Sequence, residues 1–326
     1  MMGATLYARG TRDGIILGSR HPHAHSQQVL DMLGCAVYEW FLPAHEYKQS
    51  VLPDCAVEST VNQSNPQRVL EDLAFGVAFR GSGLAHPLYK APTSGVEQGE
   101  GALRHFLEYC QRHGNHGLVS SGMDADELHY LQAEEMAFKG PRTRLPMPSV
   151  PARATFHSGE ERVEVEGAGR NYLLMAVPLP AAQESAAKGM LVSKALSFLL
   201  DPRARIPFGT CNSFISGCSL PSNGGITLRP FHAEYSNGGL IGLIMEAPKS
   251  VDLKEAGKTV ISFLQNTTAS KEQLFMAKER ALLDLYATWD SLETRTEYLA
   301  RLVLAGQYQS LYAEGIHTSD IATVPL

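Results

Sequence analysis

Cysteine is scarce in this chain of 326 residues, and its five thiols are widely spaced without a CxxC pair. That spacing disfavours a disulfide framework and a structural zinc knuckle, so we expect buried thiols in a reducing compartment. Long apolar runs are also lacking, because stretches such as residues 240–245 fall far short of the roughly 20 residues that a membrane-spanning helix requires. We therefore expect no membrane span, and we expect any targeting segment to be absent from this sequence.

The chain also has fewer basic than acidic residues. The chain has 28 Lys and Arg against 34 Asp and Glu, a formal net charge of −6. A nucleic-acid or anionic-membrane surface would need clustered basic residues to replace counterions, so we set both classes aside. What is present is 44% hydrophobic residues, enough for packed cores, and a length that favours about two domains.

Prolines interleave with arginines between residues 139 and 153, which is the clearest change of composition in the chain. At that density prolines remove backbone donors and fix φ, so this stretch is predicted to be an extended connector. We therefore predict a first repeat over residues 1–138, a linker over 139–153 and a second repeat over 154–326.

The first half is predicted to form a hairpin followed by helices. Its strands cover residues 4–9 and 14–18, and Asp13-Gly14 is expected to supply the positive φ of a tight turn. Helical spacing of apolar residues follows in three stretches, namely 29–40, 44–62 with a kink near Pro53, and 65–81 with Asn65-Pro66 as its start signal.

The second half is predicted to repeat this order. A hairpin over 227–235 and 240–245, with its turn expected at Ser236-Asn237-Gly238-Gly239, precedes helices at about 251–264, 271–285 and 292–304. Ahead of that hairpin lie predicted strands at 152–157, 162–166 and 171–177, and a helix carrying Leu191 and Ala195. If the halves are a duplication, the first repeat is incomplete, without its opening strands and first helix, and the second stops early.

This order of elements resembles the pitrilysin-type metallopeptidases and their respiratory-chain relatives, the core proteins of mitochondrial ubiquinol:cytochrome c reductase. The residues that carry the resemblance are Asn65-Pro66-Gln67, His86-Pro87-Leu88-Tyr89, the stretch 196–214 and the stretch 231–242. The resemblance implies an α+β fold of duplicated repeats, with mainly antiparallel sheets and helices packed on one side. It also implies a peripheral position on the matrix side of the mitochondrial inner membrane, beside a homologous first core protein and other subunits of the respiratory complex.

An active member of that family needs an H-x-x-E-H helix, which brings two imidazoles to one zinc, and a distal acidic ligand. The chain contains no H-x-x-E-H, and Glu46 is the nearest candidate for the distal acid. The resemblance therefore implies a zinc-less homologue that is not an enzyme, a structural subunit without catalytic, metal-binding or cofactor-binding residues.

Two alternatives stay open. The first is the substrate-recognising subunit of the mitochondrial processing peptidase, which is marked by a glycine-rich loop. The corresponding stretch, 201–210, holds a single glycine and is stiffened by Pro202 and Pro207, which disfavours this alternative. The second is an active peptidase whose H-x-x-E-H lies upstream of Met1.

Three histidines, His21, His23 and His25, alternate around Pro22 and could bind a transition metal, but they have no acids nearby in the sequence. We expect a solvated loop there. A second group, His105, His113 and His116, is expected near a helix end, where a cation meets the helix dipole favourably.

The acidic residues between 124 and 135 are better explained by helix capping than by catalysis. Glu134-Glu135, with Asp124 and Asp126 at the start of the same predicted helix, shows the acid bias of a capped helix more than a pair of catalytic carboxylates. Gly81-Ser82-Gly83 fits the end of a helix better than a phosphate-binding loop.

Overall fold

The computed structural model describes residues 3–39, 43–89, 99–113, 116–136, 154–164, 169–179, 186–203, 213–219, 225–235 and 237–304. The chain forms two compact units. Unit 1 comprises Met1–Ser64, Leu88–Ala152 and Trp289–Gly306, and unit 2 comprises Asn65–Pro87, Arg153–Thr288 and Gln307–Leu326. The division into two repeats and a linker at residues 139–153 stays a prediction.

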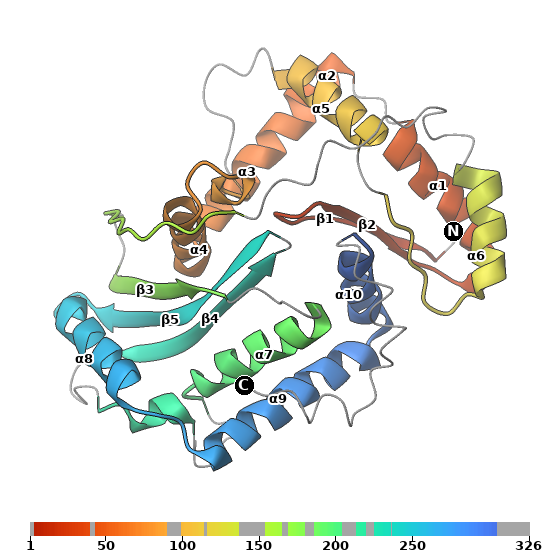
Figure 1. Ribbon diagram of the computed structural model, residues 1–326. Helices are drawn as coiled ribbons and strands as arrows, with labels where there is room; N and C mark the ends of the chain where they lie inside the picture. Colours follow the sequence, from red (N-terminus) through yellow and green to blue (C-terminus); the bar gives the residue numbers. More distant parts are fainter. Residues whose placement is uncertain are drawn as a thin grey trace. The chain divides into compact units, whose positions relative to one another are not determined.

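Unit 1 contains an antiparallel hairpin of β1 (Thr5–Gly10) and β2 (Ile15–Arg20), as predicted (Figure 1). The Thr11 N–H donates to the Gly14 carbonyl at 2.8 Å, which places Arg12 and Asp13 at the centre of the turn. Gly14 is not among the described glycines with positive φ. The expectation for Gly14 was therefore wrong, because this glycine closes the turn instead of forming its centre.

One face of this hairpin is packed. Tyr7 lies opposite Gly18, and a Cβ at Gly18 would come within 2.2 Å of the tyrosine ring. On the same face Arg9 forms an ion pair of 3.1 Å with Glu297 of α10 (Leu292–Leu304). Burial, together with the charges of Glu297 and Glu293, raises the pKa of Tyr7. Helix α10 therefore closes this side of the hairpin.

Helix α1 (Ser26–Tyr38) buries Val29 and Leu30. Its last carbonyls receive a cap from α5 (Gly99–His113), whose Gln111 side chain donates to the backbone oxygens of Val37 at 3.0 Å and Tyr38 at 3.3 Å. Such a bond satisfies carbonyl groups that have no partner within their own helix. Residues 40–42, at the end of the predicted helix, lie outside the described residues.

The predicted irregularity near Pro53 occurs as a π-helical turn. Helix α2 (Ala44–Glu46) continues into this turn at Tyr47–Val51 and then into α3 (Leu52–Gln63). Proline inside a regular helix clashes with the carbonyl four residues earlier and donates no hydrogen bond. A widened turn directly before Pro53 relieves that conflict.

Unit 2 is built on a three-stranded antiparallel sheet in the order β3-β5-β4 (Figure 1). The strands are β3 (Arg170–Pro178), β4 (Thr227–Tyr235) and the central β5 (Gly238–Pro248). Apolar side chains on both faces of β5 are buried, which agrees with its almost continuous apolar sequence. The prediction of strands at 171–177, 227–235 and 240–245 is confirmed.

Two other predicted strands are not present in the described structure. Residues 154–164 carry no regular structure, so the strands expected at 152–157 and 162–166 were wrong within that range. Backbone hydrogen bonds attach this segment to unit 2. The Ala154 N–H donates to the Asn237 carbonyl at 3.2 Å, and the His157 N–H donates to the Ala78 carbonyl at 2.8 Å. The charged stretch that follows, 160–164, is exposed and has no apolar face to bury.

Helix α4 (Pro66–Ala78) covers one face of the sheet. Its start is as predicted, because the Asn65 side chain accepts a hydrogen bond from the Gln67 N–H at 3.0 Å. Phe75 and Phe79 are buried against the strand residues Phe231, Leu240 and Ile244. After the helix Gly81 adopts a positive φ of 79°, which confirms helix termination there.

The opposite face is covered by α8 (Leu253–Asn266), whose Ala256 and Val260 pack against Leu243 and Met245 of β5. Helices therefore lie on both faces of this sheet, which corrects the expectation of helices on one side.

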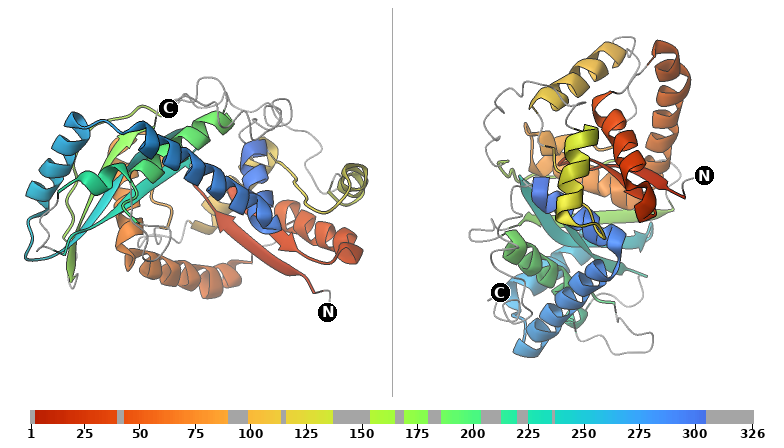
Figure 2. Two further views of the ribbon diagram at one scale, coloured as in Figure 1. Left: turned by 90° about the horizontal axis from the view of Figure 1, so that it is seen from below. Right: turned by 90° about the vertical axis from the view of Figure 1, so that its right-hand side faces the viewer.

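Two further helices complete unit 2, α7 (Ala186–Leu199) and α9 (Lys271–Asp290). They lie side by side (Figure 2), joined by an ion pair of 2.6 Å between Lys194 and Asp284. Helix α9 buries Ala277, Ala281 and Leu285 on one face, as its sequence predicts.

Candidate functional site

Glu46, the candidate for the distal acidic zinc ligand, is not grouped with other possible metal ligands in the described structure. Glu46 lies in the short helix α2, and both it and His45 are exposed. Across the described ranges, the structure contains no group of three or more His, Cys, Asp or Glu side chains that could hold a metal ion. A lone carboxylate does not form a zinc site.

The three alternating histidines contact three different partners. The His23 Nε2 lies 3.0 Å from a carboxylate oxygen of Glu127. The His25 Nδ1 lies 3.1 Å from the Gln28 side-chain oxygen, and the His21 Nδ1 lies 3.1 Å from the Ser19 hydroxyl. No acid is near these histidines in the sequence, but α6 (Ala125–Leu131) brings Glu127 to His23 from a distant part of the chain.

His21 is the histidine of this group with a perturbed pKa. Burial lowers the pKa of His21 below its ordinary value of 6.5, and the charges of His23 and His25 add to this effect. A depressed pKa favours the neutral imidazole, which is the form that ligates metals, but the other two rings are engaged elsewhere. The group is therefore a set of separate surface contacts.

In the second histidine group, His105 lies on α5 and His113 is its last residue. His116 follows the helix, and its ring centre is 5.5 Å from that of Tyr38, at the end of α1. The proposed interaction of this group with the helix dipole stays a prediction.

The acidic residues of α6 and of the π-helical turn Gln132–Met136 behave as helix-end and surface residues. Asp126 and Glu127 lie in the first turn of α6. Glu134 accepts a hydrogen bond from the Tyr130 hydroxyl at 2.6 Å, which raises the pKa of Tyr130. Glu135 accepts one from the Gln27 side chain at 2.9 Å. The two neighbouring carboxylates thus have different partners, an arrangement unlike a catalytic carboxylate pair.

Much of the stretch 201–210 lies outside the described residues. At its beginning the Asp201 carboxylate accepts from the Arg203 backbone N–H at 3.0 Å and from its guanidinium at 2.8 Å. This hydrogen bonding raises the pKa of Arg203. The start of the stretch is therefore a compact turn.

A partly buried polar cluster of Ser193, His232 and Glu234 was missed by sequence reasoning. The Ser193 hydroxyl donates to Glu234 at 2.8 Å and lies 3.0 Å from the His232 Nε2. The same Nε2 lies 3.6 Å from the Glu234 carboxylate. The signal in the sequence was the alternation of His232 and Glu234, which puts both side chains on the α7 side of β4.

This cluster is not a nucleophile with its base. In a serine triad the two nitrogens of the histidine contact the serine and the acid separately. Here one nitrogen faces both groups, and the serine proton is directed to the carboxylate. Ser193 is also 4% exposed, so it is closed to a substrate. The cluster attaches α7 to the sheet.

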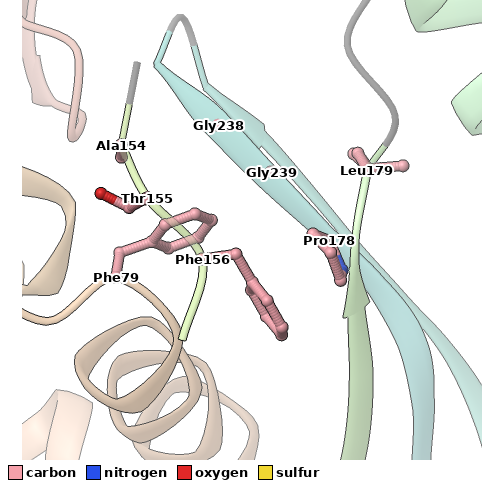
Figure 3. A pocket seen from close by; sticks show the side chains of 8 residues that line it. All are labelled: Phe79, Ala154, Thr155, Phe156, Pro178, Leu179, Gly238 and Gly239. Atoms are coloured by element: carbon pink, nitrogen blue, oxygen red, sulfur yellow. The ribbon is translucent and has the colours of Figure 1, made fainter. Parts of the chain in front are cut away.

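A hollow of about 410 Å³ opens beside the turn between β4 and β5 (Figure 3). Phe79, Phe156, Pro178 and Leu179 supply most of its apolar wall, and Ala154, Thr155, Gly238 and Gly239 complete it. A Cβ at Gly238 would lie 3.0 Å from the Phe79 ring. The glycines expected to form this turn therefore serve close packing. Among the described residues that line the hollow, none carries a charged side chain.

None of the described helices combines the length and the apolar character needed to cross a bilayer.

Similarity to known proteins was found among curated sequences and among solved structures. No family model matches the chain. The chain is 24% identical over 275 residues to mitochondrial cytochrome b-c1 complex subunit 2 of Cryptococcus neoformans var. grubii, a match that covers 84% of this chain. It spans 61% of that relative's length.

The fold was compared with solved structures. A chain in the structure of complex III2 from Candida albicans with Inz-5 bound superposes with a TM-score of 0.72 and 17% sequence identity. The match covers 98% of this chain and 78% of that chain. The mixed α+β architecture with antiparallel sheets is therefore that of a chain in complex III. By its sequence the chain is a homologue of subunit 2 of the mitochondrial cytochrome b-c1 complex.

Proposed function

We propose that the chain is the second core protein of the mitochondrial ubiquinol:cytochrome c reductase complex, a structural subunit peripheral to the inner membrane on its matrix side. The observation that carries the proposal is sequence similarity to subunit 2 along most of the chain, together with a matching fold. Its neighbours would be the homologous first core protein and other subunits of the complex. Its effect on electron transfer would then come through assembly.

We further propose that the chain is not itself an enzyme and has no catalytic, metal or cofactor site. Hydrolysis in the related peptidases needs two imidazoles one helical turn apart, and the sequence has no H-x-x-E-H. The histidine run, the acidic helix and the polar cluster each have structural partners within the described residues. These contacts support a scaffold role.

The repeat organisation belongs to the same proposal. The hairpin β1–β2 is followed by α1 and α3, and the hairpin β4–β5 is followed by α8 and α9. This shared order supports a duplication with repeats over 1–138 and 154–326 around the linker at 139–153. An incomplete first repeat would need another subunit to cover its exposed strands.

Affinity purification tests the assignment. The tagged full chain, expressed in its own mitochondria and extracted with mild detergent, should co-purify with the cytochrome b-c1 subunits in constant ratio, measured by quantitative mass spectrometry. A matrix protein with the same tag is the control. Recovery of a single peptidase partner instead would favour the subunit of the processing peptidase and refute the core-protein assignment.

Catalytic status needs a separate measurement. The purified chain should bind no stoichiometric zinc by elemental analysis and should leave unfolded peptide substrates intact. Zinc at one ion per chain, combined with peptide cleavage that a chelator abolishes, would contradict the non-catalytic proposal and leave the relationship to subunit 2 untouched.

A further inference from the structure

We draw no further inference here: the strongest candidate, the exposed apolar surface patch of Phe275, Met276, Leu283 and Tyr286 on α9, carries nothing, because nothing in the described part of the chain shows what covers it.

Discussion

The Ser193 hydroxyl donates a hydrogen bond of 2.8 Å to the Glu234 carboxylate, joining α7 to β4. Without this donor the partly buried carboxylate would lose a partner that water replaces only in part, at a typical cost of about 1 kcal/mol. Ser193→Ala should lower the free energy of unfolding by that amount, measured by urea denaturation. Ser197→Ala, one turn along the same helix, is the control and should have less effect. Equal losses in the two variants would contradict the role of the cluster.

The sheet of unit 2 should not tolerate a side chain at Gly242. A Cβ there would come 1.9 Å from the Met175 carbonyl oxygen on the neighbouring strand. Because this oxygen belongs to the backbone and not to the end of a flexible side chain, β3 and β5 would have to move apart. Gly242→Ala should cost at least about 2 kcal/mol of unfolding free energy.

Gly169→Ala is the matched control for that change, because its Cβ would meet nothing within 4 Å. Thermal unfolding of the two variants should show a clearly lower melting temperature for Gly242→Ala alone. A Gly242→Ala protein as stable as the control would mean that the close approach of the strands is wrong.

The depressed pKa of His21 predicts a dependence of stability on pH. Burial is its first cause, and the ordinary value is 6.5. The unfolded state therefore binds a proton more readily than the folded state, so the stability present above about pH 6.5 is lost as pH falls through that value and levels off below the folded pKa.

His21→Asn should remove this contribution, since asparagine can replace the Nδ1 contact with Ser19 but does not titrate. The difference in unfolding free energy between the unmodified chain and the variant should shrink or reverse from about pH 8 to about pH 5. A difference that stays flat, or that grows in favour of the histidine on acidification, would refute this account.

Two thiols should react slowly in the folded protein. Burial raises the pKa of Cys110 and of Cys218. Because the thiolate is the reacting form, alkylation by iodoacetamide should begin at higher pH than for a free cysteine peptide. Mass spectrometry of the labelled peptides measures each site separately, and in urea both should react like the free peptide. The four described cysteines are half-buried, so the expectation of fully buried thiols was wrong for them. Equal rates in the folded and unfolded chain at neutral pH would contradict the partial burial of Cys110 and Cys218.

The sequence was most informative where a local rule determines the outcome. Asn65 followed by Pro66 is a cap and a first helical residue, and the helix begins there. The apolar spacing of Ala277, Ala281 and Leu285 gives the buried face of α9. The proline connector and the duplication depend on no such local contact, and they remain predictions.

The sequence-based predictions were wrong where contacts between residues far apart in the chain determine the structure. Gly238 was assigned to a turn, but its lack of a side chain is needed by Phe79 from another element. Alternating apolar residues near Phe156 predicted a strand, yet this segment pairs with the sheet at too few points to form a ladder. The Ser193 cluster joins a helix to a strand that lies far along the chain, and no single-sequence pattern marks such a pair.

Removal of the chain from its own mitochondria tests the core-subunit account most directly. Depletion should remove the assembled cytochrome b-c1 complex from native gels, with a matching loss of ubiquinol:cytochrome c reductase activity. Re-expression of the full chain should restore both. A complex that assembles fully and keeps its activity without the chain would contradict the account.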